Sequence, residues 1–376
     1  MTPSLSTPLE CAQSLVPDIL SSADAIDKGR EIPSDLVFKI KQNNLLRLLV
    51  PKSMGGEEMD WRKFLDVVFT IAYADGSVGW CINQGCVFAT NSARKPRNVT
   101  EKIWSDKFSS VGNGPPSNVV SNRTNGGYLL SGTWRFSSGC RHATWLAALA
   151  GGDANGPPRL HFLPRDDIKL VDVWQVQGLR GTGSFSFSTK DYFVPDDQVL
   201  PLNQGIYEPN PLYVVPQSLM FACGFGTVAL GVARSGLDGV LELAQSKKPQ
   251  FGGLTLAKDP VIQSKIGVAE GKWRGAKALL FSTVEEVWQS VQEKSAITLE
   301  ERVNLRLVGT HAIRESAAVV DIVYNLSGST AIFESTQIQR KFQDIHVITQ
   351  QVQGREAHYQ AVGSFVLGQE IEGGIL

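Results

Sequence analysis

The sequence lacks both a long hydrophobic run and an excess of one charge. No apolar run reaches the roughly 20 residues that a membrane-spanning helix needs, and 36 basic residues balance 37 acidic ones. This balance gives no bulk electrostatic reason to expect nucleic acid or an anionic membrane as a partner. Because the amino terminus also lacks a basic region followed by a hydrophobic one, we expect a cytoplasmic protein.

Paired cysteines and the common catalytic motifs are missing as well. The five cysteines are odd in number and scattered, which favours reduced thiols over a disulfide framework. Neither the cysteines nor the five histidines have the spacing of a zinc site, so we expect no metal. No hydrolase nucleophile elbow occurs. The Gly-x-Gly runs at 112–114 and 224–226 lack the strand and helix of a Rossmann dinucleotide site.

Three compositional zones follow one another along the 376 residues. Residues 1–108 show apolar residues three and four apart, which indicates helices. Residues 109–205 alternate short apolar runs with Gly, Pro and Asn, which predicts an antiparallel β-domain. Residues 206–376 predict a helical bundle. Its long helices are expected at 216–246, 259–295, 298–327 and 336–353.

Two of these helices have recognisable starts. Asp259 and Pro260 fit the N-cap and first helical position, and Thr298 followed by Glu301 forms a capping box.

Apolar and small residues cover more than one face of 216–246 and 298–327. A single chain should not bury both helices completely, so we expect a homo-oligomer, a tetramer built as a dimer of dimers.

Two segments of the β-zone are richer in hydroxyl groups than a plain sheet edge requires. In "SGTWRFSSGCRHATW", residues 131–145, the strand-like alternation of Trp134 and Phe136 breaks at Ser138. In "GLRGTGSFSFS", residues 178–188, glycines on both sides of Thr182 would allow a planar or anionic ligand to approach closely. A tight turn between strands also explains this second segment by itself.

The last long helix carries an uncharged polar face. Its members recur at intervals of four, three, four and three residues: Gln339, Gln343, His346, Gln350 and Gln353. The neighbouring apolar residues would dock on the bundle: Ile338, Phe342, Ile345 and Val352. A solvated face would be expected to carry Lys and Glu, so this pattern favours the wall of a wet, enclosed pocket. On it, His346 alone can exchange a proton near pH 7.

Together these segments resemble the acyl-CoA dehydrogenase fold, and within it the two-component monooxygenases that take reduced flavin from a separate reductase. The resemblance is carried by residues 48–81, 126–145, 174–199 and 337–351. It implies an α+β protein with an N-terminal helical domain, a central antiparallel β-domain and a C-terminal four-helix bundle.

The resemblance also implies roles for residues. The segment from Trp134 to Ser138 would pass along the isoalloxazine ring, with a serine hydroxyl near flavin N5, and the "RGTGS" stretch would close the site. His346 matches a histidine of the monooxygenases, where it would stabilise a peroxide or take a proton from the substrate. The expected flavin-binding residues are Trp134, Phe136, Ser137, Ser138, Thr182, Gly183, Ser184 and Arg340.

The sequence departs from the family in two places. Gln353 stands where acyl-CoA dehydrogenases have their catalytic glutamate, and an amide cannot act as that base, so desaturation of a CoA thioester is not expected. The monooxygenases often carry a histidine after the Gly-Trp pair, and "GWCINQGCVFAT" has none. Another side chain would replace it, or substrate activation differs. The expected substrate-pocket residues are Asn83, Gln84, Cys86, Gln350 and Gln353.

These observations predict a monooxygenase that binds reduced FMN or FAD and forms a C4a-(hydro)peroxyflavin with O₂. Its substrate would be a small aromatic or heteroaromatic compound, and its partner a flavin reductase. Because water promotes the loss of peroxide, such chemistry needs a dry pocket. Two alternatives remain at this point: a flavin oxidase or dehydrogenase acting on a non-CoA substrate, and a catalytically silent homologue that binds flavin or a partner.

Overall fold

A computed structural model describes residues 6–95, 97–152, 156–203, 205–250 and 252–371. Its chain groups into two compact units. The first unit comprises Met1–Asp60, Cys81–Val176 and Arg180–Tyr213, and the second comprises Trp61–Trp80, Gln177–Leu179 and Val214–Leu376. Helix α5 (Gly76–Ala89) contributes residues to both units.

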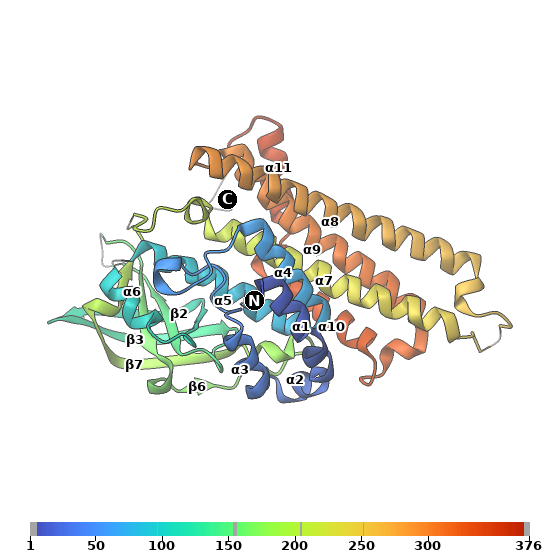
Figure 1. Cartoon of the computed structure of the whole chain (residues 1–376), viewed down its shortest axis with the longest axis horizontal. Coiled ribbons are helices and arrows are strands. Elements are labelled where there is room, and N and C mark those ends of the chain that lie inside the picture. Colours follow the sequence, from blue (N-terminus) through green and yellow to red (C-terminus); the bar gives the residue numbers. More distant parts are fainter. Residues whose placement is uncertain (1–5, 96, 153–155, 204, 251, 372–376) are drawn as a thin grey trace, which may run out of the picture. The chain divides into compact units, whose positions relative to one another are not determined.

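Short helices and two sheets form the first unit (Figure 1). A capping box of Thr7 and Glu10 starts the first helix, which buries Ala12, Leu15 and Ile19. Such a cap satisfies backbone N–H groups that the helix itself leaves without acceptors. The helices are α1 (Pro8–Ser21), α2 (Ala23–Gly29), α3 (Ser34–Gln42) and α6 (Arg97–Trp104).

The two sheets each have four strands, in the orders β1-β4-β5-β8 and β2-β3-β7-β6. The strands are β1 (Val111–Gly114), β2 (Pro116–Thr124), β3 (Gly127–Ser137), β4 (Trp145–Ala150), β5 (Arg159–Pro164), β6 (Leu170–Val171), β7 (Phe185–Pro195) and β8 (Val199–Pro201). All pairs are antiparallel, as predicted, except β1 with β4. That pair is parallel because the chain builds β2 and β3 of the other sheet before it returns.

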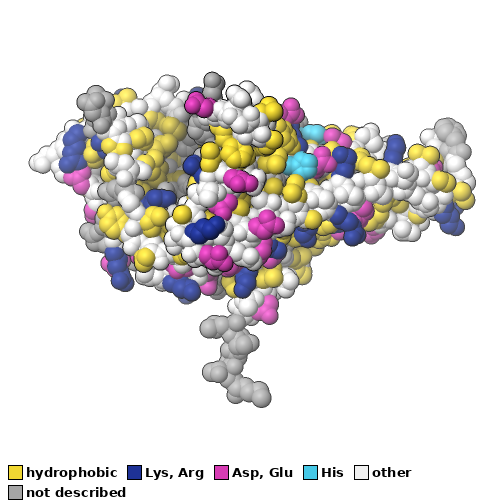
Figure 2. Space-filling model, turned by 90° about the horizontal axis from the view of Figure 1, so that it is seen from above, with side chains coloured by type: hydrophobic (Ala, Val, Ile, Leu, Met, Phe, Trp, Pro, Cys, Tyr) yellow, Lys and Arg dark blue, Asp and Glu magenta, His cyan; other side chains and the backbone are white. Residues whose placement is uncertain are grey.

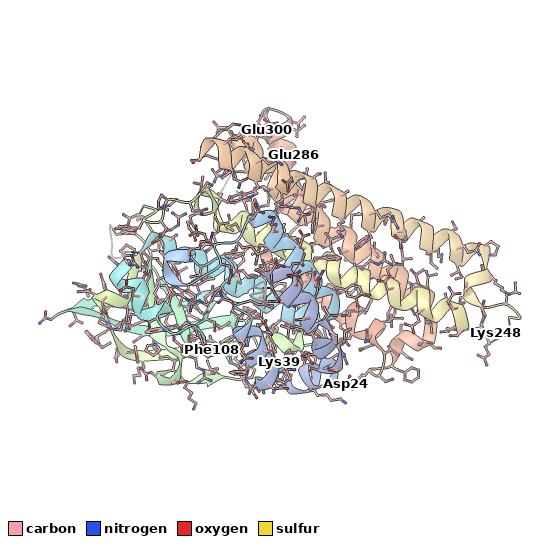
Figure 3. All side chains as sticks on the ribbon, in the orientation of Figure 1. Asp24, Lys39, Phe108, Lys248, Glu286 and Glu300 are labelled. Carbon is pink, nitrogen blue, oxygen red and sulfur yellow. The ribbon has the colours of Figure 1, made fainter. Side chains whose placement is uncertain are left out.

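Long helices form most of the second unit (Figure 1). They are α4 (Trp61–Ala74), α7 (Gln217–Ser246), α8 (Pro260–Lys294), α9 (Leu299–Ser327), α10 (Gln337–Thr349) and α11 (Ala357–Val366). The predicted caps at Asp259 and Thr298 are confirmed. In Figure 3, Lys248 marks one end of this unit, while Glu286 and Glu300 lie toward the other, so α8 runs along its length.

The predicted helix 336–353 is too long. Helix α10 ends at Thr349, and a 3₁₀ turn follows at Val352–Gly354. The break occurs at Gln351, which has an extended backbone with φ −76° and ψ 151°, and whose side chain accepts from the backbone N–H of Gln353. Sequence patterns also missed α11.

Helix α7 is the core of the helical unit. It packs against α9, α4, α10 and α8, and its glycines allow close approach, since a Cβ on Gly231 would lie 2.9 Å from Ala72. By length and composition α7 could cross a membrane, but 83% of its apolar window is buried. Its neighbours thus cover most of α7 within one chain.

Charge is mixed on the surface. On the face shown in Figure 2, Lys and Arg side chains alternate with Asp and Glu side chains. This distribution follows from the balanced composition and provides no large field of one sign on that face.

Candidate functional site

Three hydroxyl groups form a hydrogen-bonded chain in the first unit. Ser138 Oγ lies 2.7 Å from Ser184 Oγ, and Ser184 Oγ lies 2.7 Å from Thr182 Oγ1. Ser138 follows β3, whereas Ser184 immediately precedes β7. Thr182 and Ser184 are buried and Ser138 is half-buried. The fold thus brings together the hydroxyls of Ser138 and Ser184, which are more than 40 residues apart in the sequence.

The backbone around these hydroxyls is shaped for close approach. Phe136 has φ 51°, a left-handed conformation that is unusual for an aromatic residue. Gly183 also has φ 51°, and a Cβ there would lie 3.1 Å from the carbonyl oxygen of Arg30. The N–H of Gly139 donates to Thr182 O over 2.9 Å. Strain of this kind persists where the surrounding structure fixes it, often at functional sites.

The two predicted aromatic residues of this segment have different environments. Trp134 is fully buried in the β-domain core, where it stacks on Phe187 with 5.0 Å between ring centroids. Its Nε1 donates to Leu149 O, so this residue supports the strand. Phe136 is 63% exposed and can pack against a ligand. Ser137 is fully buried, and its hydroxyl has no hydrogen-bond partner among the described residues.

Helix α5 presents the residues expected in place of the missing histidine. Asn83 is fully buried, and neither amide atom has a hydrogen-bond partner among the residues described. Gln84 instead donates to Asn113 Oδ1 over 2.9 Å. Cys86 donates to Leu45 O, and burial raises the pKa of its thiol to about 12. Because a buried amide is costly without partners, Asn83 is the best candidate of the three for contacting a ligand.

A cavity of about 410 Å³ lies in the second unit beside α10. Its lining residues are Gln177, Tyr324, Ala331, Ile332, Gln339, Phe342, Gln343 and His346. Three members of the predicted polar face therefore line one cavity. Phe342, expected to dock on the bundle, also lines it, and its ring stacks on Tyr324 with 4.1 Å between centroids.

His346 has a defined partner in this cavity wall. Its Nε2 lies 3.0 Å from Asp321 Oδ1, and its ring meets Phe342 edge-on, with centroids 4.5 Å apart. An ionised carboxylate can only accept a hydrogen bond, so Nε2 carries the proton. In the neutral ring, Nδ1 is then the acceptor. This geometry allows His346 to receive or hold a proton at Nδ1.

The rest of the predicted polar face lies elsewhere. Gln350 is exposed. Gln353 is buried, and its amide oxygen accepts a hydrogen bond from the guanidinium of Arg306. The expectation of one continuous five-residue face was therefore wrong, because the helix that would align these side chains ends at Thr349. Neither glutamine lines the cavity beside α10.

Sequence reasoning missed Asp344 on the same helix. Its Oδ1 accepts from the backbone N–H of Leu179 over 2.6 Å, and Leu179 has φ 49°. Leu179 directly precedes the turn Arg180–Thr182 that carries one of the three hydroxyls. The sequence signal that could have indicated Asp344 is that it is the one acidic residue in 337–349, a segment whose other polar residues include three glutamines. Arg340, predicted to bind flavin, acts electrostatically on the buried Lys341 of the same helix.

Comparisons with known proteins identify the family. Residues 223–354 match the model for the acyl-CoA dehydrogenase C-terminal domain. The chain is 30% identical over 353 residues to indole-3-acetate monooxygenase of Pseudomonas putida, with 92% of this chain and 89% of the relative covered. It is 29% identical over 355 residues to the flavin-dependent monooxygenase oxygenase subunit HsaA of Rhodococcus jostii, with 88% of this chain and 90% of the relative covered.

A solved structure agrees with these relatives. The crystal structure of 3-HSA hydroxylase from Rhodococcus sp. RHA1 has a TM-score of 0.90 and 25% identity, with 99% of this chain and 100% of that chain covered. The predicted fold class is thereby confirmed. The chain belongs to the flavin-dependent monooxygenases of the acyl-CoA dehydrogenase fold, as an oxygenase component.

Proposed function

We propose that this protein oxygenates a small aromatic or heteroaromatic compound, using O₂ and reduced FMN or FAD supplied by a separate reductase. Relatives that support this substrate class include indole-3-acetate monooxygenase and the oxygenase component of p-hydroxyphenylacetate 3-hydroxylase from Acinetobacter baumannii. The observation that carries the proposal is the hydrogen-bonded chain of the Ser138, Ser184 and Thr182 hydroxyls, which begins two residues after the exposed Phe136 in the sequence.

These residues fit a flavin. An exposed aromatic ring can pack on a planar heterocycle, while a half-buried serine hydroxyl can bond to its polar edge. Gly183 has no side chain, and a Cβ at this position would lie only 3.1 Å from the carbonyl oxygen of Arg30. When bound, the flavin supplies the activation of O₂. The protein's part is to hold the ring, orient its polar edge and exclude water.

The cavity beside α10 fits the aromatic substrate. Its volume of about 410 Å³ lies in the range usual for small-molecule sites, roughly 300–1,000 Å³. Phe342 and Tyr324 offer aromatic surfaces, and Gln339 and Gln343 offer amide groups for orientation. His346 holds or takes a proton at Nδ1, while Asp321 fixes the proton on Nε2.

The structure also bears on the alternatives. The Gln353 amide is bound to Arg306 in a buried cluster, and it has no basic lone pair for removing a substrate proton. This arrangement disfavours desaturation of a CoA thioester. An oxidase or dehydrogenase acting on another substrate remains the competing function, and it differs in which flavin redox state the protein retains.

We also propose a homotetramer in the cytoplasm. One exposed face of α8 carries Gly267, Gly271 and Gly275, and Val268 and Leu279 beside them are 52% and 41% exposed. Apart from the exposed Arg274, which pairs with Glu270, this face is small and uncharged, and it suits close packing against a helix of another copy. The odd number and scattered positions of the five cysteines support a reducing compartment. A monomer in light scattering at micromolar concentration would contradict the tetramer.

The test of the function uses anaerobically reduced flavin. The protein is mixed with it, air-saturated buffer containing an indole or a phenol is added, and oxygenated product and H₂O₂ are both measured. Product formation that requires the protein supports the proposal. Purification as a yellow protein that retains oxidised flavin, without oxygen transfer, would favour the oxidase or dehydrogenase. Binding of neither flavin form would indicate a silent homologue.

A further inference from the structure

We propose that the cavity beside α10 selects an uncharged aromatic compound with a neutral polar substituent, such as an amide, over the corresponding carboxylate. This inference rests on the proposed function and narrows the substrate class of the same cavity. The observation is the chemistry of the lining, in which three glutamine amides, one phenol and one imidazole stand among apolar groups. A carboxylate, that of Asp321, binds the imidazole.

Helix α10 presents its part of the lining in two rows. Gln339 and Gln343 are four residues apart, as are Phe342 and His346, so each pair lies along one side of the helix. Gln177 adds a third amide to the same cavity. An amide offers both donors and an acceptor but carries no charge. This lining matches a flat ligand whose edge carries neutral hydrogen-bonding groups.

The charge behind this lining is negative. Asp321 Oδ1 lies 3.0 Å from His346 Nε2, and a proton added to His346 would only balance that carboxylate. A carboxylate ligand would therefore meet a like charge. It would also lose hydration without gaining a cationic partner, since the described lining residues include no Lys or Arg. The corresponding amide carries no charge and can pair with the glutamines.

Basic side chains near these residues make other contacts. Lys341 on α10 is buried, and its Nζ donates to the carbonyl oxygen of Ala74 over 3.2 Å. Arg340 acts electrostatically on Lys341. Lys247 Nζ donates to Thr330 Oγ1 over 2.7 Å and so holds the 3₁₀ turn that precedes α10. None of the three basic residues belongs to the described residues that line the cavity.

The experiment compares ligands that differ in charge but hardly in shape. Indole-3-acetamide and indole-3-acetate form one pair, and p-hydroxyphenylacetamide and p-hydroxyphenylacetate form the other. Equilibrium dialysis with the full chain gives the four dissociation constants, with and without anaerobically reduced flavin. Each amide should bind at least about tenfold more tightly than its acid, because the acid loses hydration without a partner. This preference would distinguish the chain from relatives that are named for the two acids.

A cation placed in the lining should shift the preference toward the acids. Gln343→Lys should change the ratio of the two dissociation constants by about tenfold in favour of the acid. Gln343→Met removes the amide without adding charge, so it should weaken binding of the amides without improving that of the acids. The matched control is Gln289→Lys on α8. Gln289 is exposed, donates to Glu285 over 2.7 Å and does not line the cavity, so all four dissociation constants should match wild type.

The outcomes separate the two proposals. Equal or tighter binding of the acids by wild type would overturn this inference, and so would an unchanged ratio in Gln343→Lys or a failure of all four compounds to bind. The proposed function still stands in these cases if an aromatic compound is oxygenated. Selective binding of the amides without any oxygenated product from reduced flavin and O₂ would uphold the selectivity and overturn the proposed function. If Gln343→Lys does not fold, Gln339→Lys provides the same comparison, and an unchanged ratio there refutes the inference.

Discussion

Replacing His346 tests the proposed chemistry most directly. The ring lies in the wall of the cavity beside α10, with Nε2 fixed by Asp321 at 3.0 Å. A positioned proton-transfer group contributes about a hundred- to ten-thousandfold in rate. We expect His346→Ala to lose product formation by a factor in this range and to release H₂O₂ instead, while the fold and the affinity for reduced flavin are retained. His346→Asn should keep part of the coupling, because an amide still forms hydrogen bonds.

The contribution of Asp321 should be much smaller. Its side chain is 49% exposed and that of His346 is 34% exposed, so solvent screens the pair. An exposed pair of this kind contributes at most about 1 kcal/mol, which corresponds to about fivefold. Asp321→Asn should therefore slow product formation less than about fivefold. A loss as large as that of His346→Ala would show that Asp321 does more than orient the ring.

A control histidine is available in the same unit. His311 on α9 is also partly exposed and lies 3.4 Å from the hydroxyl of Tyr359, away from the residues that line the cavity. The assay measures O₂ consumed, product formed and H₂O₂ released with reduced flavin in excess. His311→Ala should match wild type. If His346→Ala couples O₂ use to product as well as wild type does, His346 is a structural residue and the mechanism is wrong.

Three further predictions concern stability. Burial lowers the pKa of Lys95 to about 7, so between pH 7 and about 10 the unfolded chain binds one proton more than the folded chain does at this residue. Lys95→Met should therefore stabilise the protein by a few kcal/mol at pH 7. In urea unfolding, this gain in stability should shrink as the pH rises from 7 to about 10. Burial lowers the pKa of His161 and of His358 to about 4, so the stability of the fold should fall as the pH drops from 6.5 to 4. In His161→Gln, the midpoint of urea unfolding should depend less on pH between 6.5 and 4. An unchanged dependence would show that His161 does not have this lowered pKa. Gly183→Ala should cost about 1–2 kcal/mol in unfolding free energy, because its φ of 51° is left-handed; unchanged stability would show that this turn relaxes.

The sequence predicts the helical segments well where local chemistry determines them. The caps at Asp259 and Thr298 give helix starts within one residue, because a side-chain acceptor and its backbone donors are close in the sequence. The end of α10 was missed because the residue types near it do not mark a helix end. Gln351 caps the 3₁₀ turn that follows the helix. The spacing of the glutamines continues through the break, and no Gly or Pro stands between Thr349 and Gln353.

The candidate site was predictable only where local pattern and resemblance agreed. Ser138, Thr182 and Ser184 were expected from resemblance, but their mutual hydrogen bonds depend on how β3 and β7 pair. The alternation of Trp134 and Phe136 indicates one strand, and it cannot tell which ring enters the core. The positive φ of Phe136 turns its side chain out of the regular alternation, and this conformation has no signature in the residue types.

Helix α10 explains why one short segment carries so much of the site. Asp344 and His346 are two residues apart, which places them about 200° apart around a helix. Asp344 anchors the N–H of Leu179, and Gly178 is needed there because a Cβ would lie 2.3 Å from the carbonyl oxygen of Gln343. His346 faces the cavity. Both the segment 178–179 and the proton-transfer group of the second unit therefore depend on one helix, and a shift of α10 would disturb both.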